Sequence, residues 1–349
     1  MGLFKRKNRS DAGKKPSATE AVRSAGQPEA AAVPDWATSK VALELLARFF
    51  RGADPWKFIG KDHWSDVLGE KVEIVLERFR NDGALVQAPV ATKLLQRYSD
   101  DDLRYYLGES GLSQEGEREE LLGRLMAEDT TTAQRLASEI NVLILSNDAR
   151  RHVVRYVKAE RERREVAERK CLTGLLQREY LRAAATVSEY QRDSVFSRGV
   201  GIAEEDDDMS ANVAVLQLLF ERTPQMLSAI DVEALERLRA PAGMAFLWGK
   251  DSAAQWIRSD FTMDGPLEPA VVSAMLLAHA RTLYDREQYR QSGHPTYEIW
   301  CTHDRHSCPD CKAMHGRQYR IDSLPELPHA GCTSPHGCRC RTVVANTGF

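Results

Sequence analysis

The feature that most constrains this chain is a concentration of metal-binding residue types near its C-terminal end. The sequence has 349 residues, of which only seven are cysteine and nine are histidine. Most of them fall in one short segment: Cys301, His303, His306, Cys308, Cys311, His315, His329, Cys332, His336, Cys338 and Cys340. A loop-rich segment of this size buries too little apolar area to fold alone, so the crowding requires a chemical reason.

The spacing of these residues predicts a zinc site. Cys308 and Cys311 are separated by two residues, which suits a tight turn that delivers two thiolates to one ion at Zn–S distances of ~2.3 Å. A second pair must come from further along, and both His329-x-x-Cys332 and Cys338-x-Cys340 follow at roughly 20 to 30 residues. We therefore predict that zinc is bound by Cys308 and Cys311 with two or more of the other four. Which four residues bind, and whether one or two ions are held, stays open.

A disulfide framework and a redox pair are two alternative uses of these cysteines. The N-terminal stretch Met1–Arg9 is basic but is followed by no apolar signal core, and Arg6 occupies the Ser/Thr position of a myristoylation motif. A secreted, disulfide-bonded protein is therefore not expected. A redox C-x-x-C needs a strand-to-helix setting, which this segment lacks. Both arguments favour zinc.

A catalytic zinc is a further alternative, as in a metal-dependent hydrolase or nuclease. Such a site needs an open coordination position and a neighbouring general base. His303, Asp304, His306 and His315 are candidates for that base. Because four or more Cys/His ligands are available, a closed structural site is favoured and no catalytic residue is assigned.

The same segment resembles the C-terminal signature of phage minor head, or head-morphogenesis, proteins of the Mu and SPP1 type. The resemblance rests on Trp300, Asp304-Arg305, Cys308-x-x-Cys311, Gly316, a Pro-rich approach to His329-x-x-Cys332, and Cys338-Arg339-Cys340. In that family the end runs H-P-x-C-R-C, whereas this chain places Thr333–Gly337 between the two halves. The resemblance covers about 45 residues. It implies a virion-assembly protein with portal or capsid partners, located in the host cytoplasm or the virion.

A second segment resembles the SAP motif, a helix, extended turn and helix that in many proteins binds DNA. The match runs from Gly111-Leu112-Ser113 through Gly116 and Arg118 to Leu121-Leu122, with Ser99 as a helix N-cap. Between residues 93 and 129 five basic residues face ten acidic ones, a net charge of −5. Glu117 also stands where DNA-binding SAP units carry a basic residue. We expect protein packing more than DNA contact here.

The rest of the chain predicts a mainly α fold with a multi-helix body and a small irregular zinc lobe. Residues 133–198 read as long proline-free helices, and 158–170 mixes charges at helical spacing, as in an exposed spacer. Helical patterns recur at 211–221, 232–238, 253–257 and 270–291. Cys171 reads as a small buried apolar residue, and Glu204–Asp208 as a solvated acidic loop. The predicted divisions are 1–36, a basic Ala/Pro-rich tail; 37–130, with the SAP-like unit at 94–128; 131–299, the long-helix body; and 300–349, the zinc lobe.

Composition limits the function classes without deciding among them. No apolar run approaches the ~20 residues that cross a bilayer, so no membrane-spanning role is expected. The net charge of −3 gives no general attraction for nucleic acid. Residues 301–349 carry six basic and four acidic side chains, a net +2 that permits nucleic-acid contact. We expect a structural or assembly protein that could form oligomers; the alternative is a nucleic-acid-binding protein using the SAP-like unit, the zinc lobe and the basic N-terminal arm.

Overall fold

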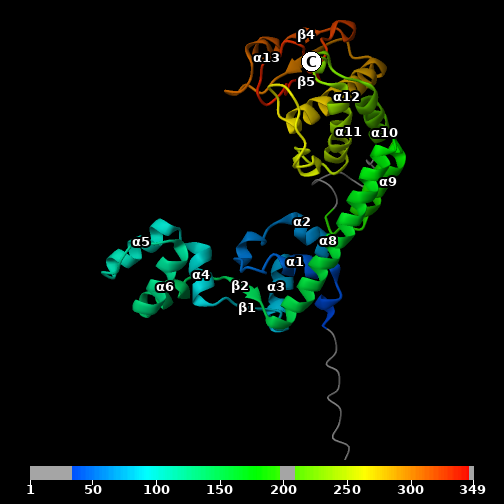
Figure 1. Cartoon of the computed structure of the whole chain (residues 1–349). Helices are drawn as coiled ribbons and strands as arrows, with labels where there is room; N and C mark the ends of the chain where they lie inside the picture. The colour runs from blue at the N-terminus through cyan, green and yellow to red at the C-terminus, as the bar shows by residue number, and fades with distance from the viewer. Residues whose placement is uncertain (1–33, 197–208, 346–349) are drawn as a thin grey trace, which may run out of the picture.

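The computed structural model describes residues 34–196 and 209–345, and this part of the chain is mainly helical (Figure 1). It contains thirteen α-helices and five short strands. The mainly α prediction is therefore confirmed. The basic N-terminal arm and the acidic run Glu204–Asp208 lie outside the described residues.

The first core is built from three short helices and a two-stranded sheet. Its elements are α1 (Lys40–Ala47), α2 (Asp62–Leu68), α3 (Val72–Asn81), β1 (Leu85–Gln87) and β2 (Leu143–Leu145). The strands pair antiparallel, with Leu85 opposite Leu145. We predicted long proline-free helices across 133–198, and the strand β2 within this range is a correction. Leu143 and Leu145 are buried in the first core, and pairing with β1 satisfies backbone groups that a helix would otherwise satisfy internally.

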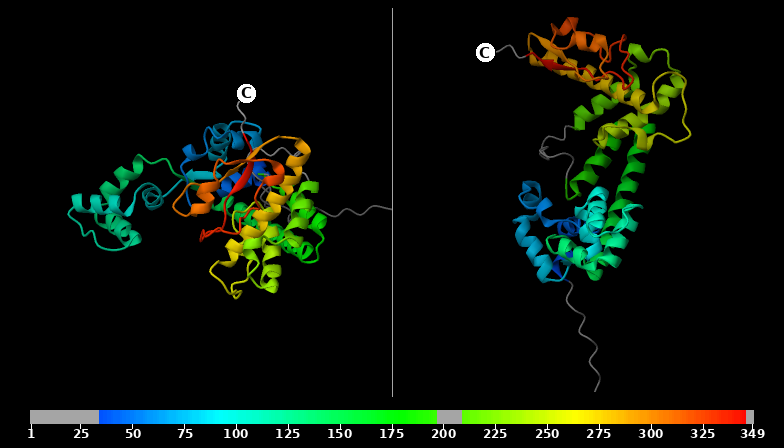
Figure 2. Two further views of the ribbon diagram at one scale, coloured as in Figure 1. Left: turned by 90° about the horizontal axis from the view of Figure 1, so that it is seen from above. Right: turned by 90° about the vertical axis from the view of Figure 1, so that its left-hand side faces the viewer.

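Four further helices form a separate unit with its own core. These are α4 (Val90–Arg97), α5 (Asp100–Glu109), α6 (Arg118–Glu128) and α7 (Thr130–Ser138). Ser99 begins α5 with a capping box to Asp102, as its sequence predicts. Gly111, with a φ of 68°, follows the end of α5 in the left-handed region that glycine adopts without strain. Seen from above, α4–α6 project to one side of the molecule (Figure 2).

The longest helix, α8 (Asn147–Leu176), links the two ends of the molecule (Figure 1). Its 30 residues span about 45 Å. Ala149 and Val153 near its start are buried in the first core, whereas Cys171 and Leu175 near its end are buried in the C-terminal core. Its middle carries ion pairs at i,i+3 and i,i+4, such as Lys158–Glu162. The predicted spacer helix and the buried Cys171 are thus confirmed.

The C-terminal body consists of four helices that pack with the end of α8. They are α9 (Tyr180–Arg192), α10 (Met209–Glu221), α11 (Val232–Leu247) and α12 (Pro269–Ser292). We predicted a helix at 232–238, but α11 continues through Pro241 to Leu247. A proline inside a helix costs ~3 kcal/mol or more. Nearly every residue from Leu238 to Leu247 is buried, and this burial offsets that cost.

A small lobe follows α12 and lies against it (Figure 1). Its elements are β3 (Tyr297–Trp300), α13 (Pro309–Met314), β4 (Gln318–Tyr319) and β5 (Arg341–Val344), with β3 central and antiparallel to both other strands. Side chains of α12 reach lobe carbonyls: His279 Nδ1 lies 3.0 Å from Leu327 O, and Arg286 donates to Ile321 O at 3.1 Å. The body therefore fixes the position of the lobe. Across the described ranges, no helix combines the length and apolar character that a membrane crossing requires.

Candidate metal centre

The centre begins with a turn that Cys308 makes at the start of α13. Cys308 is the N-cap of this helix, and its Sγ accepts a hydrogen bond from the backbone N–H of Cys311 at 3.3 Å. Pro309 occupies the first helical position, where its fixed φ is favourable and no N–H is needed. The C-x-x-C spacing thus folds into one turn with both sulfurs on the same side. Both thiols are buried.

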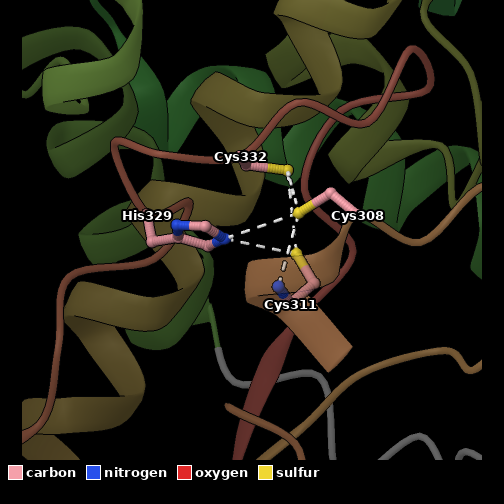
Figure 3. A group of neighbouring side chains, drawn as sticks. All are labelled: Cys308, Cys311, His329 and Cys332. Carbon is pink, nitrogen blue, oxygen red and sulfur yellow. Dashed lines mark hydrogen bonds between the residues drawn. The ribbon is translucent and has the colours of Figure 1, made fainter. Parts of the chain in front are cut away.

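Four side chains from two distant segments converge on one point. Cys308 and Cys311 face His329 and Cys332, which follow the buried Leu327 (Figure 3). The Sγ atom of Cys332 lies 3.8 Å from that of Cys308 and 3.7 Å from that of Cys311. The Nε2 atom of His329 lies 4.0 Å from Cys308 Sγ and 3.3 Å from Cys311 Sγ.

These separations are those of a tetrahedron around a single small ion. With metal–sulfur bonds of about 2.3 Å, two tetrahedral thiolates lie about 3.8 Å apart, and a thiolate and an imidazole nitrogen about 3.6 Å apart. The four ligand atoms all lie within 4.8 Å of one another. They are too far apart for disulfide bonds, which hold two sulfurs at about 2.05 Å. The group can hold a metal ion with every position filled by protein.

Backbone amides near Cys308 favour its charged form. Burial opposes ionisation, but the amides of Cys311 and Thr333 donate to its sulfur and lower its pKa to about 6. The neighbouring Cys311 behaves oppositely, because burial raises the pKa of its thiol to about 12. The backbone amides thus favour the thiolate of Cys308, whereas burial favours the protonated thiol of Cys311, whose proton a metal ion would displace.

A second group of thiols adjoins the first and shares Cys311 with it. The Sγ atoms of Cys311, Cys338 and Cys340 lie within 4.8 Å of one another. Hydrogen bonds from the thiols of Cys332 and Cys340 lower the pKa of Cys338, and the pKa values of these two donors are raised in turn. These hydrogen bonds thus favour a thiolate at Cys338 and protonated thiols at its two donors.

The structure brings together all six residues for which the sequence predicted metal binding. Cys308, Cys311, His329 and Cys332 form the first group, while Cys338 and Cys340 lie in the second. Our sequence interpretation did not assign Cys301, yet its buried thiol hydrogen-bonds with those of Cys340 and Cys311. The sequence did carry a signal for its position. Cys301 directly follows a short alternating apolar stretch, Tyr297–Trp300, which forms β3.

The remaining histidines of the lobe stand outside both groups. Nδ1 of His315 accepts a hydrogen bond from the backbone N–H of Cys301 at 3.1 Å, and the His303 ring packs edge-on against His315. The rings of His306 and His336 pack against each other in the same way. In the metal groups found among the described residues, none of these four is a member. The hydrogen bond of His315 and these ring contacts join the loops of the lobe.

A bidentate ion pair connects two segments of the lobe that are distant in sequence. Arg339 donates to both carboxylate oxygens of Asp304, each at 2.7 Å. This hydrogen-bonded guanidinium lowers the pKa of the Asp304 carboxyl below its ordinary range. Since Arg339 stands between Cys338 and Cys340, the pair joins the loop after β3 to the last two cysteines.

Three comparisons with known proteins found nothing similar to this chain. No protein-family model matches it, and no match was found among curated proteins or solved structures.

Proposed function

We propose that this chain is a structural protein of virion assembly whose C-terminal lobe is folded by zinc. The observation that carries the proposal is the closed first group: Cys308, Cys311, His329 and Cys332 supply four buried or half-buried ligands at tetrahedral spacing. A site filled by four protein ligands has no position for a substrate or an activated water. Its contribution is to the folding of the lobe.

Zinc is proposed because the ligands are soft and their arrangement is tetrahedral. Three thiolates and one imidazole suit zinc, whereas magnesium and calcium prefer oxygen ligands. Besides cysteines, the buried lobe cluster contains Ile299 and Leu327, with Met226, Met314 and Tyr319 packed against it. This is little apolar area for a segment of this length. Metal binding would therefore supply most of the folding free energy of the lobe.

A paired substitution separates this function from the hydrolase alternative. In Cys311→Ser, we expect zinc to be lost and the lobe to be cleaved by protease after Trp300, with the helical body intact. In His303→Ala, zinc content and protease resistance should be unchanged, because this exposed histidine is outside the metal groups. Metal-dependent cleavage of nucleic acid or peptide that vanishes in His303→Ala, with zinc fully bound, would contradict a structural role.

The assembly role follows the resemblance of the lobe to minor head proteins and is tested by particle formation. The chain would be expressed with the portal and capsid proteins encoded beside its gene, and the particles separated by sedimentation. We expect the chain to sediment with assembled heads, and Cys311→Ser to remain unattached if the folded lobe makes the contact. A wild-type chain that stays free of portal, capsid and heads would contradict the assembly role but leave the zinc lobe unaffected.

A further inference from the structure

The first group leaves three buried thiols of the lobe without a role. Cys301, Cys338 and Cys340 belong to the same buried cluster as the ligands already described, and all three are free thiols. Cys338 Sγ lies 3.9 Å from Cys311 Sγ, which is close to the separation of two thiolates on one tetrahedral ion. These three thiols and Cys311 therefore form a second candidate quartet.

The strand register places Cys301 beside Cys340 independently of any thiol contact. In the antiparallel pair of β3 and β5, Trp300 lies opposite Arg341. Cys301 directly follows β3 and Cys340 directly precedes β5, so continuing this register by one position would place them opposite each other. Side chains alternate along a strand, so Cys301 points to the same face as the fully buried Tyr297 and Ile299. The pairing of β3 and β5 thus brings the two thiols together at one end of the sheet.

The thiol contacts complete this quartet. Cys301 hydrogen-bonds with Cys340 and Cys311, and Cys340 hydrogen-bonds with Cys338, Cys301 and Cys311. The Sγ atoms of Cys311, Cys338 and Cys340 lie within 4.8 Å of one another, and the thiol of Cys301 adjoins those of Cys340 and Cys311. The thiol of Cys301 also interacts electrostatically with that of Cys338.

We propose that the lobe binds two zinc ions, the second held by Cys301, Cys311, Cys338 and Cys340, with the Cys311 sulfur bridging both ions. Two four-coordinate ions that share one ligand require seven ligands. The lobe provides seven, six buried cysteines and His329. Arg339, between two second-site ligands and close to the sulfurs of Cys311 and Cys332, partly offsets the excess negative charge of six thiolates on two divalent ions.

This inference rests on the proposed zinc lobe, and metal counting distinguishes the two. Native mass spectrometry of the full chain, purified with reductant and without added metal, should show two zinc ions per chain. One zinc would overturn the second site and leave the first, whereas none would overturn the zinc lobe as a whole. A Cys338–Cys340 disulfide in the reduced, freshly purified protein would also overturn the second site.

Substitutions assign the ions to their ligands. Cys301→Ser should reduce the content from two zinc ions to one, because Cys301 belongs to the second quartet alone. Cys171→Ser is the matched control, since it removes a buried cysteine of the helical body, and it should keep both ions. A Cys301→Ser chain that folds and still binds two ions would contradict the assignment. If that variant fails to fold, the wild-type count still decides.

The bridge has a spectroscopic test of its own. In the full chain loaded with cadmium-113, we expect two cadmium resonances of equal intensity that split each other through the shared sulfur of Cys311. Zinc and cadmium favour the same tetrahedral thiolate sites, so the exchange should preserve both positions. A single resonance, or two resonances without mutual splitting, would overturn the bridged arrangement.

Discussion

At the scale of single residues, Gly337 shows how tightly the metal-binding loop approaches the helical body. Its φ is +74°, and a Cβ there would lie 2.9 Å from atoms of Met275 and 3.0 Å from Val271, both on α12. The left-handed conformation costs a non-glycine residue roughly 1–2 kcal/mol. Here any side chain at position 337 would also overlap with side chains of α12.

We predict that Gly337→Ala destabilises the lobe by about 2–5 kcal/mol, of which roughly 1–3 kcal/mol comes from overpacking. Gly316→Ala is the matched control, because Gly316 has a φ of +71° and open space around it. The measurement is the urea concentration at which each variant releases zinc to a chromophoric chelator. Equal effects of the two substitutions would mean that the loop does not press on α12.

The acidic cap Asp129 provides a pH-dependent test away from the metal. Hydrogen bonds from the hydroxyl of Ser110 and the backbone N–H of Thr132 lower the pKa of its carboxyl below the ordinary 3.8. Because the pKa is lower in the folded than in the unfolded chain, the stabilisation is fully present above about pH 4. It is lost as the pH falls through the folded-state pKa.

Asp129→Ala should therefore speed amide exchange in peptides covering 118–138 at pH 7, and the difference from wild type should shrink at pH 3. Asp101→Ala is the control, since that side chain is 95% exposed and lies in the first turn of α5. A difference that is the same at both pH values would show that the carboxylate charge contributes nothing to the cap.

At the scale of elements, the helices α5 and α6 use their basic residues in contacts within the chain. Arg118 forms an ion pair with Asp100 and donates to the carbonyls of Leu95 and Tyr98. Arg124 donates to the carbonyls of Ser113 and Glu115 at 2.6 and 2.9 Å, which fixes the extended turn between α5 and α6. Lys93 and Arg104 also have partners within the chain. These contacts leave few cations for phosphate.

We predict that a chain beginning at residue 34, which lacks the basic arm, binds duplex DNA no more tightly than about 10⁻⁴ M at physiological salt. The expected reason is the net charge of −5 of residues 93–129, together with the contacts that Arg118 and Arg124 make within the chain. A salt titration by fluorescence anisotropy is the measurement. Micromolar affinity with a steep salt dependence would contradict the prediction.

The elements also show what the sequence could and could not predict. Local signals were sufficient for the knuckle at Cys308 and Cys311, the cap at Ser99 and the charged spacer in α8. The position of Cys301 depends on strand pairing with a segment 40 residues away, and β2 exists because β1 offers a partner edge. Such pairings are non-local, so spacing along the chain does not reveal them. The extension of α11 through Pro241 likewise depends on burial by neighbouring helices.

At the scale of the whole molecule, the chain consists of separate cores joined by α8. Two clusters lie in the N-terminal half, a third surrounds α10–α12, and the fourth is the cysteine-rich lobe. The first three contain many leucines and other large apolar side chains, whereas six of the eight buried residues in the fourth are cysteines. Each of the first three should therefore fold without metal, and the lobe should not.

The most direct test is amide hydrogen exchange of the full chain before and after complete zinc removal by a chelator. We predict that peptides covering residues 301–345 lose their protection while those covering the N-terminal cores, 36–153, keep theirs. Returning zinc should restore the protection, and the control Cys171→Ser should behave like the wild type. Persistent protection of residues 301–345 in a chain verified to be free of metal would contradict the account, because the lobe would then fold without its ion.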